Sequence, residues 1–394
     1  MESFFDSYIF FILLAAALVP ALVLGLCRKR LSYYGFGVSL VFLCFLFSTS
    51  KHAWMFLLAF LVVEVFNVEF YLHRKIKGTA GKAHFVIALI LALAPLTTYK
   101  ICEIWSFPLL GFLGISYITF KVLQMVLETH DGLIEKMNVF ECLYFLVFFG
   151  TFESGPIDRS RRFIDDMRAP APARAEFLDQ FGKGLALIIV GLLYSIVLAD
   201  LFKGWFNPVA FDGSDPAASW ITFGHNAFAY AGYLFFNFAG YSLMAMGTGY
   251  CFGIKVPRNF RAPFISTDIK DFWNRWHITL SYWLRDFVFM RFTRFALHRK
   301  LFKSRLTTAC CAFMINMTLM GCWHGLTPDY LMYGAFHGIL LSICEVYQKK
   351  SAFHKKHRKQ NWYKACSWAV TMVCVLFSFC LFSGQLSTFV GWSS

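Results

Sequence analysis

Two of the eleven histidines lie in surroundings that can support chemistry. His324 ends an apolar run and enters a Gly/Pro turn, within the string Asn-Met-Thr-Leu-Met-Gly-Cys-Trp-His-Gly-Leu-Thr-Pro at 316–328. An ionisable side chain in an apolar run is costly and usually marks a functional site, and imidazole can act as a base near neutral pH. His277 lies at the edge of a tryptophan-rich amphipathic segment. The alternatives are a structural hydrogen bond in a tight turn for His324 and an interfacial side chain that reaches water for His277.

The sequence motifs of several other kinds of catalytic site are absent from this chain. The close pair His354 and His357 is surrounded by Lys and Arg, which weaken metal binding, so we interpret it as part of a charged loop. There is no H-E-x-x-H and no set of paired histidine boxes, which disfavours a zinc protease or a di-iron desaturase. A nucleotide-binding G-x-x-x-x-G-K-[ST] loop and a G-x-S-x-G elbow are absent as well. We therefore expect no metal site and no bound cofactor.

The composition places these histidines in a membrane protein. Of 394 residues, 58% are hydrophobic and only 15% are charged, whereas soluble domains carry about 25% charged residues. Such a chain cannot hide its apolar surface in one soluble core, which excludes a soluble enzyme, a disordered chain and a fibrous repeat. Because backbone groups in lipid must be satisfied within the segment, the apolar runs are expected to be helices. We predict an all-α polytopic membrane protein whose residues 1–394 form a single domain.

About eleven apolar segments are long enough to cross the bilayer or nearly so, since a crossing helix needs about 20 residues. Some of the shorter ones are candidates for half-spans. The segments are 8–26, 34–50, 53–72, 85–99, 104–120, 137–152, 184–199, 226–254, 306–323, 330–344 and 365–392.

The net charge of +14 is concentrated between these segments. Short loops rich in Lys and Arg stay on the cytoplasmic side, so the pattern predicts topology and contact with anionic headgroups, not nucleic acid. Six such loops on one side place both the N-terminus and the C-terminus outside. The basic loops are 28–30, 74–82, 159–174, 255–275, 299–305 and 349–364.

The segment between two of these basic loops is not expected to cross the membrane. Its apolar residues recur at helical spacing on one face, which predicts an amphipathic helix in the interface or a re-entrant hairpin. Asp268 is the expected N-cap. Gly- and Pro-bearing strings at 108–114 and 150–156 interrupt two other segments, where irregular backbone must be buried or line a cavity. The apolar face of the amphipathic segment comprises Ile269, Phe272, Trp273, Trp276, Leu280, Trp283, Leu284 and Phe287.

Three strings resemble the membrane-bound O-acyltransferase superfamily. They are Asn-Phe-Arg-Ala-Pro-Phe at 259–264, Asp-Phe-Trp-Asn-Arg-Trp-His-Ile-Thr-Leu-Ser-Tyr-Trp-Leu-Arg-Asp at 271–286, and Trp-His-Gly at 323–325. The strings at 154–159, 287–291, 316–327 and 333–338 are similar to the branch that D-alanylates cell-envelope polymers. Alginate-type O-acetyltransferases usually carry Arg where Asn274 stands. The resemblance covers most of the chain and is strongest over 230–345.

This resemblance implies a ring of tilted helices around a thinned centre, crossed by a narrow tunnel. It implies a donor in the cytoplasm, D-alanine held as a thioester on the phosphopantetheine arm of a small acidic carrier protein, and an acceptor hydroxyl reached from outside. His324 would act as the general base, and His277 would orient the acyl group or polarise its carbonyl. Asn274 and Trp323 would line the tunnel.

The implied carrier needs a basic, partly apolar dock on the cytoplasmic side. A small membrane helper peptide, a second membrane protein and lipid are further implied partners in a bacterial cell membrane. Two alternatives remain open, a polysaccharide O-acetyltransferase of the same superfamily and a flippase or channel in which both histidines merely line a path. The final acceptor is open too: lipoteichoic acid, another polymer or lipopolysaccharide. The residues expected to form the dock are Met290, Arg291, Arg294, Lys300, Lys303 and Arg305.

Overall fold

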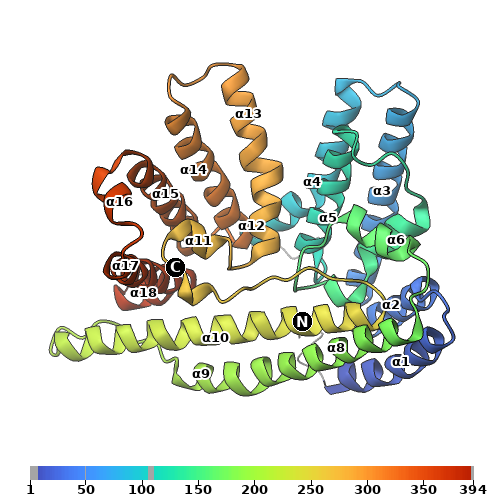
Figure 1. Cartoon of the computed structure of the whole chain (residues 1–394), viewed down its shortest axis with the longest axis horizontal. Coiled ribbons are helices and arrows are strands. Elements are labelled where there is room, and N and C mark those ends of the chain that lie inside the picture. Colours follow the sequence, from blue (N-terminus) through green and yellow to red (C-terminus); the bar gives the residue numbers. More distant parts are fainter. Residues whose placement is uncertain (1–7, 49, 105–110, 392–394) are drawn as a thin grey trace. The chain divides into compact units, whose positions relative to one another are not determined.

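The computed structural model describes residues 8–48, 50–104 and 111–391, and every regular element within these ranges is a helix (Figure 1). The all-α prediction is therefore confirmed. The chain folds as two compact units, and the division falls within two continuous helical stretches. The single domain over 1–394 that the sequence suggests stays a prediction.

The first unit comprises residues 1–192 and 241–257. Helices α3 and α4 lie side by side in it, joined by a short basic turn (Figure 1). Its elements are α1 (Tyr8–Leu26), α2 (Ser32–Leu46), α3 (Lys51–Ile76), α4 (Lys82–Ile104), α5 (Ile115–His130), α6 (Val139–Val147), the 3-10 turn η2 (Phe149–Thr151), α7 (Ser160–Arg168), α8 (Arg174–Leu192) and the last turns of α10 (Pro216–Cys251).

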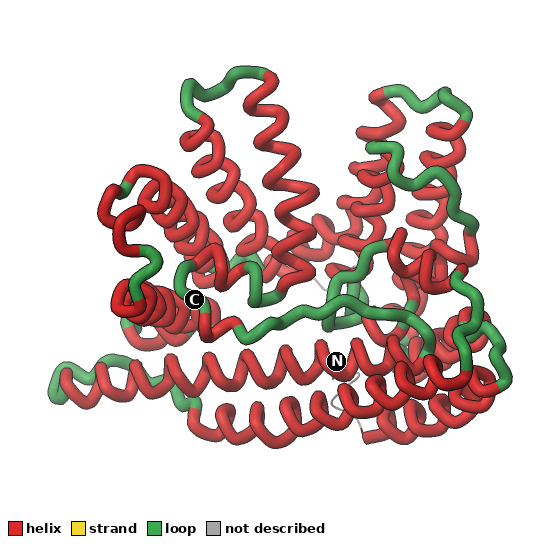
Figure 2. The backbone as a smooth tube through the Cα atoms, in the orientation of Figure 1, coloured by secondary structure: helices red, strands yellow, loops and turns green. Residues whose placement is uncertain are grey.

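The second unit comprises residues 193–240 and 258–394 and contains both candidate histidines. A long irregular stretch, 252–262, leads from the end of α10 to Pro263 (Figure 2). The elements are η3 (Leu193–Leu198), α9 (Ala199–Trp205), the first part of α10, η4 (Pro263–Ile265), α11 (Ile269–Trp273), α12 (Ile278–Leu284), η5 (Arg285–Phe289), α13 (Met290–His298), α14 (Arg305–His324), α15 (Pro328–Lys350), α16 (Ala352–His357), α17 (Asn361–Phe382) and α18 (Gln385–Phe389).

Six described helical stretches are long and apolar enough to cross a membrane. This number agrees with a polytopic membrane protein, whereas the predicted total of about eleven spans, the ring and the thinned centre stay predictions. The six stretches are Tyr8–Leu26, Lys51–Ile76, Lys82–Cys102, Arg174–Trp205, Arg305–His324 and Asn361–Phe382.

The irregular segment after α6 is buried, as the sequence predicts for non-helical backbone inside a membrane protein. α6 ends at Val147, and the following residues through Phe152 have almost no exposed surface. The Lys121 ammonium donates hydrogen bonds to the Phe145 carbonyl at 3.0 Å and to Thr151 Oγ1 at 3.2 Å. One buried lysine thus satisfies acceptors that the interrupted helix leaves open. The other predicted interruption, 108–114, lies partly outside the described residues.

Of the two forms predicted for the tryptophan-rich segment, the continuous interfacial helix is wrong, because two short helices joined by a turn are observed. α11 ends at Trp273, a four-residue turn follows, and α12 begins at Ile278. The tryptophans at 273, 276 and 283 are buried inside the protein, not placed at a lipid interface. The chain reverses here because backbone hydrogen bonds tie the turn to the preceding loop, from Arg261 N to the Arg275 carbonyl and from Ile278 N to the Asn259 carbonyl. The predicted N-cap is confirmed, since Asp268 accepts from two backbone amides of α11.

Helices α14 and α15 form a hairpin with very close backbones. A Cβ added at Gly334 would lie 2.5 Å from the Met317 carbonyl oxygen, and one added at Gly321 would lie 2.5 Å from the Tyr330 carbonyl oxygen. Small residues permit such approach between apolar helices, where van der Waals packing replaces the hydrophobic effect. This close packing fixes the end of α14, and with it His324.

Candidate active site

His324 is the last residue of α14, immediately before the turn into α15. The turn has extended backbone at Gly325, and α15 begins with Pro328 in its first turn. The half-buried imidazole packs edge-on against Phe382 of α17, with ring centroids 4.9 Å apart, and lies 6.0 Å from the Tyr330 ring. Three helices therefore hold a partly accessible imidazole at the end of a candidate span.

His277 lies in the turn before α12, with its backbone in the left-handed region at φ 44° and its side chain only 3% exposed. Its Nδ1 lies 3.1 Å from Asn259 Oδ1. The backbone amide and hydroxyl of Thr279 also donate to that oxygen, at 3.3 and 2.9 Å, which fixes it as the acceptor. His277 Nδ1 therefore carries the hydrogen, and Nε2 of the neutral ring keeps its lone pair. The interfacial alternative for His277 is wrong because the side chain is enclosed.

Trp323 brings the two imidazoles into one cluster. Its ring centroid lies 4.6 Å from that of His324 and 6.4 Å from that of His277. Burial lowers the pKa of His277 well below its usual value, and the positive charge that His324 can carry lowers it further. The site thus pairs a buried neutral imidazole with a more accessible one.

Asn274 is the C-cap residue of α11 and lines a cavity of about 240 Å³. Trp273 and Asn316 line the same cavity. The Oδ1 atom of Asn316 is buried there without a hydrogen-bond partner among the described residues. Trp323 does not line this cavity, so the structure brings the two expected tunnel residues to different places, Asn274 to the cavity wall and Trp323 between the histidines.

The comparisons with known proteins bear on this arrangement. The model of the membrane-bound O-acyltransferase family matches residues 39–383, which include both histidines and the cavity. The chain belongs to this family. It is therefore an acyl-transferring enzyme of a membrane.

Several curated relatives resemble this acyltransferase over nearly its whole length. A teichoic acid D-alanyltransferase of Bacillus subtilis is 37% identical, over 97% of this chain and 98% of the relative. One of Streptococcus thermophilus is also 37% identical, over 96% of this chain and 94% of the relative. A probable alginate O-acetylase of Pseudomonas aeruginosa is 27% identical, over 85% of this chain and 65% of the relative.

The acyltransferase also presents the basic surface that the sequence suggests as a dock. Met290 begins α13 and is 49% exposed, and Arg294, Lys300, Lys303 and Arg305 are exposed along α13 and the turn into α14. α13 and α14 lie side by side (Figure 1). Arg291 is only half-buried, so it contributes less surface than its neighbours. The six residues thus belong to one hairpin.

Two features of the acyltransferase site escaped the sequence reasoning. Asn259 occurs in a motif string, but nothing in the sequence shows that its amide reaches His277. His337 on α15 is fully buried and accepts a hydrogen bond from Trp273 Nε1 at 3.2 Å, a contact that the sequence does not show. Within the described ranges, no group of three or more His, Cys, Asp or Glu side chains is placed to hold a metal ion.

Proposed function

We propose that this acyltransferase moves D-alanine from the phosphopantetheine thioester of an acidic cytoplasmic carrier protein to an acceptor hydroxyl for D-alanylation of teichoic acid. The observation that carries the proposal is near full-length similarity to teichoic acid D-alanyltransferases, combined with an accessible imidazole beside a buried one. The protein would lie in a bacterial cell membrane, with both termini outside.

His324 is the proposed general base. Its imidazole takes the proton of the acceptor hydroxyl, and the oxygen attacks the thioester carbonyl. The carbon–sulfur bond then breaks, and the departing pantetheine thiolate takes up the proton from the imidazolium. A thioester held in line with the hydroxyl needs no metal for this exchange.

His277 is the proposed orienting residue for the acyl group. Because its Nδ1 hydrogen is engaged by Asn259, the ring presents an acceptor, Nε2. A hydrogen-bond acceptor can bind the α-ammonium of D-alanine, whereas the carbonyl oxygen of the thioester needs a donor. Of the two roles that the sequence left open, we therefore favour orientation over carbonyl polarisation.

The donor side requires a dock and a path for the pantetheine arm. The basic hairpin surface around Lys300 and Lys303 complements an acidic carrier. The cavity lined by Asn274 and Asn316 is apolar with a few polar groups, as pockets for extended ligands usually are. A helper peptide or a second membrane protein would take up or pass on the alanine.

The proposal is tested with the purified chain in liposomes, carrier loaded with labelled D-alanine, and a glycerol-phosphate acceptor. His324→Ala should lower transfer by at least about a hundredfold, the usual contribution of a general base. His225→Ala, at an exposed position of α10, should leave the rate unchanged. Transfer at the wild-type rate by His324→Ala would remove this residue from the chemistry.

The same assay separates the competing functions. The similarity to a probable alginate O-acetylase makes a polysaccharide O-acetyltransferase the first alternative. Such an enzyme would not use the D-alanyl carrier and would need an acetyl donor. A flippase or channel would move substrate across the liposome membrane without forming a new ester. Labelled ester formation from the D-alanyl carrier would argue against both.

A further inference from the structure

A second, larger cavity lies in the second unit, and neither His277 nor His324 lines it. Its volume is about 640 Å³, and α11, α15, α16 and α17 surround it. One part of its lining is apolar, with Leu340 and Ile343 on α15 and Val370 and Cys374 on α17. Ile343 and Val370 are 59% and 65% exposed, so this wall is open at its side. A cavity of this size is typical of one that binds a small molecule.

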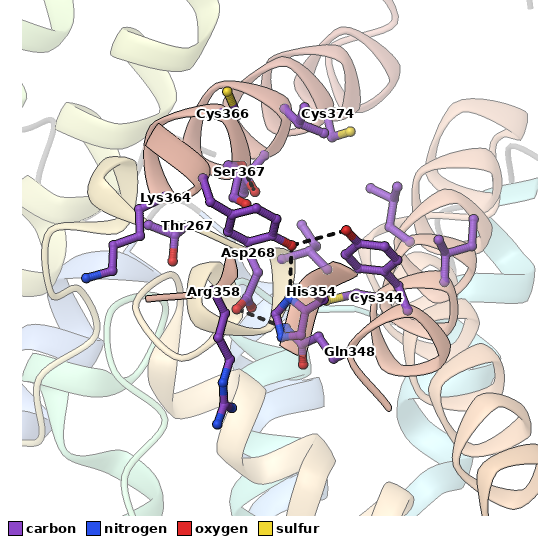
Figure 3. Close-up of a pocket in the computed structure, with 17 residues that line it drawn as sticks. Thr267, Asp268, Cys344, Gln348, His354, Arg358, Lys364, Cys366, Ser367 and Cys374 are labelled. Atoms are coloured by element: carbon purple, nitrogen blue, oxygen red, sulfur yellow. Dashed lines mark hydrogen bonds between the residues drawn. The ribbon is translucent and has the colours of Figure 1, made fainter. Parts of the chain in front are cut away.

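The other part of the lining is polar and carries positive charge. Tyr363 donates a hydrogen bond to Tyr347 at 3.3 Å and lies 2.9 Å from Nδ1 of His354 (Figure 3). Figure 3 shows Arg358 and Lys364 on one side of the cavity and Cys374 on the other. The chemistry of the lining thus changes from cationic to apolar across the cavity.

Neither of these two cations is neutralised by the described part of the protein. No carboxylate among the described residues pairs with Arg358 or Lys364, whereas the nearby Lys270 and Lys349 both pair with Glu345. The one acidic residue of the lining, Asp268, is engaged otherwise. Its Oδ1 caps α11, and its Oδ2 accepts from Gln348 at 3.1 Å. The cavity therefore has uncompensated positive charge at one end.

The length of the lining matches one leaflet of a bilayer. α17 is a candidate span that begins at Asn361, so Lys364 lies in its first turn. Basic residues at the end of a spanning helix reach the headgroups. Cys374 lies ten residues further along, which is about 15 Å at the rise of an α-helix. The hydrocarbon core is about 30 Å thick, so this distance is about half of it.

We propose that this cavity binds an anionic phospholipid. The phosphate lies against Arg358 and Lys364, and an acyl chain follows the wall formed by Ile343, Val370 and Cys374. Basic pockets at the ends of membrane helices bind lipid headgroups in this way, and an open side wall lets the chain enter from the bilayer. The site is distinct from the histidine cluster and does not depend on the proposed function.

Native mass spectrometry of the purified full chain tests this proposal. The protein is stripped of lipid in detergent and titrated with phosphatidylglycerol or with phosphatidylcholine of the same chains. Two cations near a headgroup should favour phosphatidylglycerol by about thirtyfold. Arg358→Gln combined with Lys364→Gln should abolish the preference. The matched control, Lys355→Gln combined with Lys359→Gln, removes the same charge from the same loop outside the cavity and should retain it.

Two further arms identify the ligand. Val370→Trp places a larger side chain in the apolar part of the cavity and should weaken the binding of both lipids. Because position 370 is exposed, the chain should stay folded. Free glycerol 3-phosphate is added in excess at about 1 mM, a concentration at which weakly bound ligands begin to occupy a site. It should not displace phosphatidylglycerol. Equal binding of the two lipids, equal loss in both double variants, or displacement by glycerol 3-phosphate would each overturn the proposal.

Discussion

At the residue scale, the imidazole of His277 depends on Asn259. The amide oxygen receives the ring hydrogen and two donors from Thr279, so both the tautomer and the tilt of the ring are fixed. Asn259→Leu keeps the branching of the side chain, with a larger volume, and removes this acceptor. We expect it to lower kcat by about a hundredfold, as a small misplacement of a reacting group does. Steady-state transfer from the loaded carrier measures the effect.

A purely structural role for Asn259 would give a different pattern of variants. If the residue acts through His277, the double variant Asn259→Leu with His277→Ala should be no slower than His277→Ala alone. Additive losses in this cycle would show that Asn259 acts on something else.

The burial of the His277 imidazole also predicts how the stability of the fold depends on pH. Because burial and His324 lower its pKa in the folded chain, the unfolded chain binds the proton more tightly. Its contribution to stability is therefore full above about pH 6.5, the usual imidazole value, and is lost as the pH falls below it. Thermal unfolding at pH 7.5 and 5.5 should show a smaller pH-dependent fall in Tm for His277→Gln than for the wild type. An unchanged fall would mean that this imidazole takes up its proton normally in the folded protein.

The sequence identified both histidines but not the residue that positions one of them. For His324 the residue type and the apolar surroundings suggested a functional role, because a titratable group in such a run needs a reason to be there. For His277 the surroundings also allowed an interfacial side chain, and the family resemblance suggested the role. Asn259 lies 18 residues before His277, in a loop without periodicity. Only the backbone hydrogen bonds of the folded turn bring the two together, and no local pattern encodes them.

At the element scale, the hairpin of α14 and α15 sets the position of His324. Gly334→Leu would force a side chain against the Met317 carbonyl and separate the helices. We expect a loss of roughly 3 kcal/mol or more in folding stability, with a clear fall in Tm, and loss of transfer. Gly224→Leu, in α10 with nothing within 4 Å of its added Cβ, is the control and should behave as the wild type. Equal Tm values for the two variants would show that the hairpin does not need close backbones.

The tryptophan-rich segment shows why part of the fold could not be predicted. Periodicity correctly marked an apolar face, since seven of its eight residues bracket the turn and all eight are buried. It could not show that the helix breaks at 274–277, because no Pro or Gly marks the break. A left-handed His277 and hydrogen bonds from a distant loop impose the turn, and such tertiary effects override local propensity.

At the scale of the whole molecule, the basic loops predict the topology. If all six face the cytoplasm, the C-terminus after α17 and α18 lies outside. Alkaline phosphatase, which is active only outside, should therefore be active when fused to the C-terminus and inactive when fused within 349–364. The reverse pattern would invert the predicted orientation.

The basic hairpin surface predicts how the carrier binds. Lys303→Glu with Arg305→Glu should weaken carrier affinity by about tenfold at low salt, and the difference should shrink at high salt. The control, Lys77→Glu with Lys82→Glu, reverses the same charge at the turn between α3 and α4. Equal weakening by both pairs would indicate attraction to net charge and not a dock.

The central claim is that donor and acceptor reach one imidazole from opposite sides of the membrane. The most direct measurement uses liposomes with the chain in one orientation, loaded carrier on the face of the basic hairpin, and acceptor either inside or outside. We predict labelled ester only when carrier and acceptor are on opposite sides, and none with His324→Ala. Ester formed with both on the same side, or formed without His324, would contradict the account.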